Sequence, residues 1–200
     1  MSSDQRIPFT ADGFFHLHYH SDGKPIFQID GNYMFFLVRL NKIIKPVGQV
    51  YAYCLMPQDI HLLIKTRSRE ALFEQFLDAE EGKTVDQFDP DPLIQEHLDE
   101  LKNVYTAAVQ KLFKEDEPVF GHYFHKTELE DDLAVLQCIR EIHLSPLRAR
   151  LATTPKDWKH SSYVNIAREN RTFEMGAAVL ELFGGKEHYL SYHLPTEGDH

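Results

Sequence analysis

The chain has 200 residues, of which 42% are hydrophobic, and this is enough apolar material to bury one sizeable core. Its 31 acidic residues outnumber its 21 lysines and arginines, and the net charge of −10 argues against tight nonspecific binding to nucleic acid. It has neither a basic-then-apolar signal segment nor an apolar run of membrane-spanning length, so we expect a cytoplasmic protein without a membrane partner.

The negative charge is concentrated in one stretch. Residues 74–100 contain ten acidic side chains and a single basic one, Lys83. We interpret this stretch as a solvated insertion, and the alternative is a surface for protein interactions. The expected organisation is a disordered segment at 1–12, a single domain at 13–193 that contains the insertion, and a tail at 194–200.

The first part of the domain predicts three strands and one helix. Turn residues and apolar spacing place a strand at 13–20, a helix at 32–45 that ends before Pro46, and strands at 47–56 and 59–66. The last two strands are joined at Pro57, which has no backbone donor and interrupts the ladder.

The second part is expected to be mainly helical. The pattern predicts helices at 68–77 and 93–113 around an acidic loop at 78–92, a fourth strand at 118–125, and a helix at 127–144. Thr127 and Glu130 have capping-box spacing, and Pro146 is expected to close the last helix. The order strand-helix-strand-strand-helix-strand indicates the α+β class: a ferredoxin-like antiparallel sheet with helices on one face and an added C-terminal helical region.

Polar residues alternate with apolar ones along two of these strands. Asp59 and His61 share one strand face, and His16, His18 and His20 share one face of the first strand. In a ferredoxin-like sheet the first and third strands are neighbours, so the three histidines would flank Asp59 and His61. The set is either a metal or phosphate site or a half-exposed strand face with structural histidines.

Several motifs resemble one family. Five motifs of this chain are similar to motifs of the single-tyrosine HUH transposases, in particular the REP-associated tyrosine transposases. They are YAYCLMP at 51–57, IHLLI at 60–64, EIHLSPLRAR at 141–150, DWKHSSY at 157–163 and LFGGKE at 182–187. The resemblance covers residues 13–193 and implies a ferredoxin-like fold. It also implies a partner, single-stranded or hairpin DNA, and does not choose between a monomer and a homodimer.

The resemblance implies three altered site positions. The family's strand carries two metal-binding histidines, where this chain has Asp59 and His61. The family's nucleophilic tyrosine falls at Glu141, and its helix metal ligand one turn later falls at Ser145. A carboxylate cannot replace a phenol as the nucleophile that forms phosphotyrosine, so we expect Glu141 to be non-nucleophilic and strand cleavage and transfer to be lost.

Three functions remain open, and the third is a protein-interaction scaffold that uses the acidic insertion. In the first, the protein is a transposase-like nucleic-acid-binding protein without catalysis, whose phosphate contacts come from five basic residues: Arg140, Arg148, Arg150, Lys126 and Lys159. In the second, Asp59, His61 and Glu141 form a remodelled metal-dependent phosphoesterase. The altered ligand positions would bind a divalent metal (Mn, Mg or Zn) weakly or would bind no cofactor. A mixed carboxylate and histidine set suits Mn²⁺, Fe²⁺ or Zn²⁺ better than Mg²⁺.

Overall fold

The structure, a computed structural model, describes residues 7–76, 84–121 and 124–195. Its strands are β1 (Phe14–His20), β2 (Gly48–Leu55), β3 (Asp59–Thr66) and β4 (His125–Leu129). Its α-helices are α1 (Asp30–Ile44), α2 (Arg69–Phe76), α3 (Pro90–Phe113), α4 (Asp132–Arg148), α5 (Tyr163–Ala167), α6 (Gly176–Leu182) and α7 (Lys186–Tyr192), with 3-10 turns at Val85–Gln87 and Pro155–Asp157.

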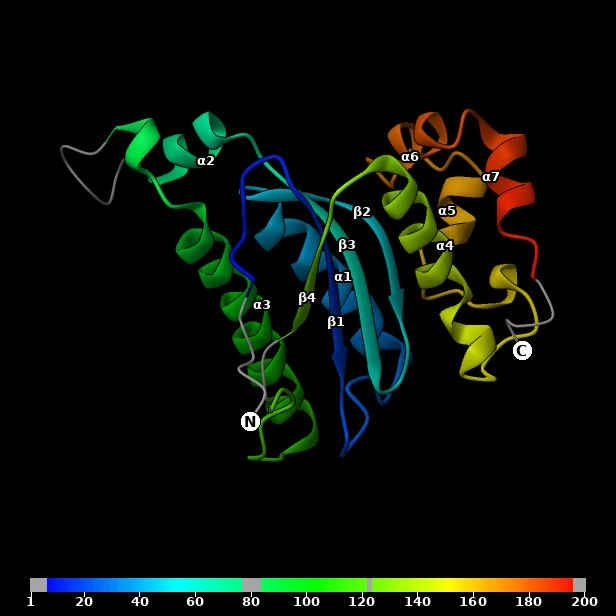
Figure 1. The fold of residues 1–200 in the computed structure, drawn as a ribbon. Helices are drawn as coiled ribbons and strands as arrows, with labels where there is room; N and C mark the ends of the chain where they lie inside the picture. The colour runs from blue at the N-terminus through cyan, green and yellow to red at the C-terminus, as the bar shows by residue number, and fades with distance from the viewer. Residues whose placement is uncertain (1–6, 77–83, 122–123, 196–200) are drawn as a thin grey trace, which may run out of the picture.

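The four strands form one antiparallel sheet in the order β2-β3-β1-β4. Figure 1 shows this sheet between α1 and α3 on one side and the helices from α4 to α7 on the other. The predicted α+β fold class, with its added C-terminal helices, is confirmed. No helix in the described ranges is long and apolar enough to cross a membrane.

Strand alternation divides the buried residues between two cores. On β3, Ile60, Leu62 and Ile64 are buried in the larger core with α1 and α3. Leu63 points to the opposite face and is buried with residues of α4 and of the C-terminal helices. Asp59 and His61 share that second face, so the polar side chains lie on the side of the sheet that α4 covers.

Two predicted elements lie further along the chain than expected. The strand predicted at 118–125 is wrong, because β4 occupies His125–Leu129. Apolar residues had suggested the earlier position, but Val119 and Phe120 pack against the core from a loop. The capping residue predicted for the next helix is also wrong: Thr127 is within β4, and α4 is capped by Asp131, which accepts a 2.7 Å hydrogen bond from the Ala134 amide.

Pro146 does not end the helix as predicted, since α4 continues to Arg148. Proline has no N–H, so the Ile142 carbonyl loses its partner in the helical hydrogen-bond ladder. The hydroxyl of Ser145 donates to that carbonyl at 2.8 Å instead. This local replacement allows the helix to accommodate proline in its last turn.

The outer edge of β2 is closed along its second half. The Leu55 amide donates to the His160 carbonyl at 2.9 Å, and the Ser162 amide donates to the Tyr53 carbonyl at 3.0 Å. The Ser162 hydroxyl accepts from the Tyr53 amide, also at 3.0 Å. Residues 160–162 thereby attach the C-terminal region to the sheet.

The expected segment boundaries fall partly outside the described ranges. Of the segment expected to be disordered (1–12), residues 7–12 are described, and Phe9 is buried with its amide 2.7 Å from the Asp91 carboxylate. The acidic stretch at 74–100 contains residues 77–83, which are outside the described ranges, while its later part belongs to α3. Of the expected tail, only residues 194 and 195 are described.

The division into cores gives a stability prediction. Leu62→Ala should lower the free energy of unfolding by roughly 2–5 kcal/mol, because Leu62 is fully buried and the truncation leaves a cavity. Val38→Ala is the matched control: its side chain is 60% exposed, and the change should stay within about 0.5 kcal/mol. Urea unfolding measures both, and equal effects would contradict the assigned orientation of β3.

Candidate functional site

A row of histidines crosses three strands on the face below α4. In the β1–β3 pairing, His18 lies opposite His61 and His20 lies opposite Asp59, as the ferredoxin-like order predicted. On the other side of β1, His125 of β4 lies opposite His18. His125 was assigned to a strand with the wrong boundaries, so its place in this row could not be read from the sequence.

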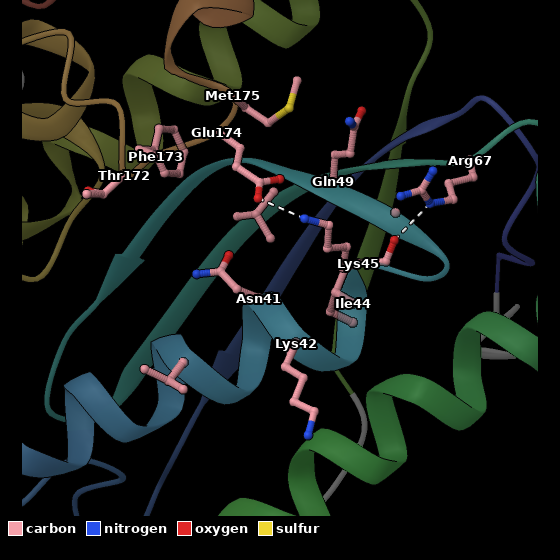
Figure 2. Close-up of a pocket in the computed structure, with 13 residues that line it drawn as sticks. Asn41, Lys42, Ile44, Lys45, Gln49, Arg67, Thr172, Phe173, Glu174 and Met175 are labelled. Atoms are coloured by element: carbon pink, nitrogen blue, oxygen red, sulfur yellow. Dashed lines mark hydrogen bonds and ion pairs between the residues drawn. The ribbon is translucent and has the colours of Figure 1, made fainter.

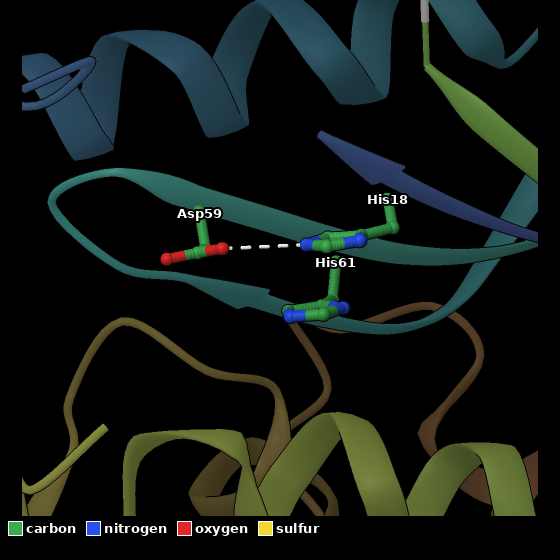
Figure 3. Close-up of side chains that lie close together, drawn as sticks. All are labelled: His18, Asp59 and His61. Carbon is green, nitrogen blue, oxygen red and sulfur yellow. Dashed lines mark hydrogen bonds and ion pairs between the residues drawn. The ribbon is translucent and has the colours of Figure 1, made fainter. Parts of the chain in front are cut away.

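Three of these groups could hold a metal ion. Ligand atoms of His18, Asp59 and His61 all lie within 4.8 Å of one another. The imidazoles of His18 and His61 are parallel, and Asp59 lies beside them (Figure 3). The two ring centroids are 4.2 Å apart, and Oδ1 of Asp59 lies 3.3 Å from His18 Nε2. Two imidazoles and one carboxylate are a donor set that fits Mn²⁺, Fe²⁺ or Zn²⁺.

Two further histidines contact these candidate ligands. Nε2 of His16 lies 3.3 Å from Nδ1 of His61, and Nδ1 of His20 lies 2.8 Å from Oδ1 of Asp59. Contacts of this kind fix the orientation of ligands around a metal. Burial, followed by the neighbouring imidazoles, lowers the pKa of His61 to about 3, so this ring is neutral at pH 7 and its lone pair is available.

The cleft between this face and α4 has a volume of about 530 Å³. The sheet contributes Asp59 and His61, and α4 contributes Glu141, Ser145 and Arg148. The structure therefore brings together all four positions to which the motif resemblance assigned chemistry. No tyrosine is among the described residues that line the cleft.

The two helix positions already have partners. Glu141 is half exposed and forms an ion pair with Arg148, and a guanidinium nitrogen of Arg140 lies 3.6 Å from its carboxylate. Ser145 is buried, and its hydroxyl proton is committed to the Ile142 carbonyl. Glu141 thus forms part of the charged rim of the cleft through its contacts with Arg148 and Arg140. His18 is better placed than Ser145 to complete a set of metal ligands with Asp59 and His61.

The five basic residues expected to contact phosphate do not form one surface. Arg148 lines the cleft, and Arg140 donates from Nε to the Tyr192 carbonyl at 2.9 Å. Lys126 is 93% buried on the opposite side of β4, with Nζ 3.2 Å from Asp91. The remaining two lie beyond the cleft.

Those two residues, Lys159 and Arg150, lie near the ends of helices. Lys159 forms a 2.5 Å ion pair with Asp30 in the first turn of α1. Arg150 is exposed just beyond the end of α4, with a left-handed backbone angle φ of 56°. Only Arg148 of the five therefore lines the proposed site.

A buried polar network holds α4 in place over the sheet. His143 Nδ1 lies 2.9 Å from His193 Nε2, and His143 Nε2 lies 2.7 Å from the Ser162 hydroxyl. Nδ1 of His193 is 2.7 Å from the Tyr189 carbonyl. The network links α4, α7 and the edge of β2. His143 and Ser162 both belong to motifs that were recognised in the sequence, but nothing in the sequence indicated that these two residues are in contact.

This network predicts a pH-dependent stability. Burial lowers the pKa of His143 well below its ordinary value and that of His193 to about 4, so both stay neutral in the folded protein while their unfolded forms protonate near pH 6.5. Stability is therefore complete above about pH 6.5 and falls below it, by about 1.4 kcal/mol per pH unit for each such histidine. Urea unfolding at pH 7.5 and pH 5.5 tests this, and equal or greater stability at pH 5.5 would contradict it.

Arg150 gives a second stability prediction. A residue other than glycine at φ 56° is strained by roughly 1–2 kcal/mol, and glycine relieves this strain at some cost in chain entropy. Arg150→Gly should raise the free energy of unfolding by up to about 1 kcal/mol. Arg168→Gly is the control, because its φ of −92° gives no such relief and the substitution should destabilise; thermal unfolding distinguishes the two.

Comparison with known proteins agrees with the fold. No family model and no curated protein matches the sequence. A solved structure of a REP-associated tyrosine transposase bound to a REP hairpin is similar, with a TM-score of 0.58 and 15% identity over 84% of this chain and 86% of that chain. The chain thus shares its α+β fold, from the four-stranded sheet to the C-terminal helices, with a transposase of the branch that its motifs resemble.

Proposed function

We propose that this chain is a transposase-like protein that binds hairpin or single-stranded nucleic acid and does not cleave it through a tyrosine. One observation carries the proposal: Asp59, His61, Glu141 and Ser145, on two elements about 80 residues apart, line a single cleft. These are the positions that the motif resemblance assigns to the site. The similar solved transposase is bound to a hairpin, which supports the same class of ligand.

The chemistry of the cleft supports the loss of strand transfer. The motif resemblance assigns Glu141 to the nucleophile position, and its carboxylate forms an ion pair with Arg148. An attack by a carboxylate on a phosphodiester would give a labile acyl phosphate in place of a stable phosphotyrosine. No tyrosine among the described lining residues offers a substitute.

A divalent metal (Mn, Mg or Zn) held by His18, Asp59 and His61 belongs to this proposal, and the donor set favours Mn or Zn. Once bound, such a cation supplies Lewis-acid polarisation of a phosphate oxygen. Arg148 at the rim provides a fixed positive charge for the same phosphate. Because the chain is acidic overall, binding should be modest and strongly dependent on salt.

Hydrolysis of a phosphoester is a second candidate function. The observation that favours it is the presence of Glu141 and Arg148 in the same cleft as the three potential ligands. Arg148 can orient a phosphate, and Glu141 is a carboxylate that can accept a proton from an attacking water. This function needs no tyrosine.

Binding and cleavage of a labelled DNA hairpin test the two functions. Binding without cleavage is the expected result, and Arg148→Gln should weaken it several-fold because a charged phosphate contact is lost. Lys111→Gln, an exposed change on α3 outside the cleft, should leave the affinity within twofold. A covalent protein–DNA adduct would contradict the proposal, cleavage without an adduct would favour the second function, and no binding at low salt would exclude the first.

Titration calorimetry with Zn²⁺ and with Mn²⁺ tests the metal site. We expect one ion per chain, and both His61→Ala and His18→Ala should weaken binding at least tenfold, because each removes one of three ligands. His188→Ala, an exposed histidine on α7, should have no effect. A metal affinity that survives His18→Ala but is lost in Ser145→Ala would show that the helix, and not β1, supplies the third ligand.

A further inference from the structure

A second hollow lies at the β2 edge of the sheet, along the half of this edge that residues 160–162 leave open. It has a volume of about 430 Å³ and shares no lining residue with the cleft under α4. Figure 2 shows it between the end of α1, the start of β2 and residues 172–175, which precede α6. We call it the edge groove.

Positive charge gathers around the edge groove. Residues 31–69 contain six lysines and arginines and one acidic residue, in a chain whose total charge is −10. Three of the six bases, Lys42, Lys45 and Arg67, line the groove, because the C-terminal ends of α1 and β3 meet there. The groove is therefore locally positive although the whole chain is negative, and a locally positive surface attracts anions.

Arg67 is held so that part of its guanidinium remains available. Its Nε donates to the Lys45 carbonyl at 2.8 Å, which fixes the side chain at the groove. Within the described ranges, its two terminal nitrogens have no hydrogen-bond partner. A fixed guanidinium with two available NH₂ groups matches the oxygens of a phosphate.

The neighbouring lysine is restrained by an acid. Nζ of Lys45 lies 2.8 Å from the Glu174 carboxylate, and both side chains are well exposed. Figure 2 shows this ion pair between the residue that follows α1 and the segment before α6. Glu174 is the single acidic residue among the described lining residues, so it opposes the binding of an anion and its removal would release a cation.

The uncharged part of the lining suits a flat heterocycle. Phe173 and Met175 form an apolar wall, and the Phe173 ring is fixed edge-on against Tyr53 with centroids 5.9 Å apart. Asn41 and Gln49 add amides that can both donate and accept hydrogen bonds. An aromatic wall with amides beside it is the chemistry that recognises a nucleobase.

Helix capping accounts for only part of this arrangement. Lysines near the C-terminus of α1 are favourable because that end of a helix is electronegative. Capping explains neither the free terminal nitrogens of Arg67 nor the apolar wall opposite them. We propose that the edge groove binds a nucleotide, with its phosphate at Arg67 and Lys45 and its base against Phe173 and Met175. The inference rests on the proposed function only if this nucleotide is part of a nucleic-acid strand, and it is independent of that function if the nucleotide is free.

Calorimetry with adenosine 5′-monophosphate and with adenosine, at low salt, tests the proposal. The monophosphate should bind saturably and adenosine about tenfold more weakly, because a charge-assisted contact is lost. Arg67→Gln should weaken monophosphate binding about tenfold, while Glu174→Gln should tighten it several-fold by releasing Lys45. Glu169→Gln is the matched control: Glu169 is also an exposed acid paired with a lysine, Lys186, at 2.9 Å, but it lies outside the groove, so affinity should not change.

Competition with the labelled hairpin identifies the source of the nucleotide. If the monophosphate displaces the hairpin, the groove holds one nucleotide of a strand; if both bind independently, it holds a free nucleotide. If the monophosphate binds with the expected effects of the variants but the hairpin does not bind, the groove proposal is supported and the proposed function is overturned. Absence of saturable monophosphate binding, or binding that Arg67→Gln and Glu174→Gln both leave unchanged, would overturn the groove proposal whatever the hairpin does.

Discussion

The antiparallel pairing of β1 with β3 is the constraint on which the site depends. Side chains alternate along both strands, so one register places Leu17 and Leu62 together in the larger core and His18 and His61 together on the other face. A shift by one residue would turn the apolar set toward α4 and the histidines into the larger core. The hydrophobic core therefore fixes the geometry of the polar face, although the histidines of that face lie outside the core.

The second requirement is a helix over this polar face. The network of His143, His193 and Ser162 attaches α4 to the C-terminal region and to the edge of β2, while Ser145 offsets the missing amide of Pro146. Buried polar groups of this kind are favourable only when their hydrogen bonds are satisfied. Because these groups are satisfied among themselves, the helix presents Glu141 and Arg148 to the cleft from a fixed position.

The sequence predicted the larger features of the molecule and missed the contacts across its layers. Periodicity in β1 and β3, together with the motif resemblance, was sufficient for the fold class and for Asp59 and His61 lying beside the histidines of β1. It failed at β4, where the apolar residues around Phe120 anchor a loop, since burial alone does not distinguish a strand from a packed loop. It could not show that Lys126 turns away from the cleft, because that orientation depends on the register of β4.

The closed half of the β2 edge limits how this sheet can grow. Edge strands expose unpaired backbone groups that can add a strand from another molecule, which is a common route to dimers and to aggregates. Here residues 160–162 occupy those groups at Tyr53 and Leu55, so a neighbouring chain has no ladder to continue along that half of β2. The segment that attaches the C-terminal region to the sheet therefore also blocks the addition of a strand along this half of the edge.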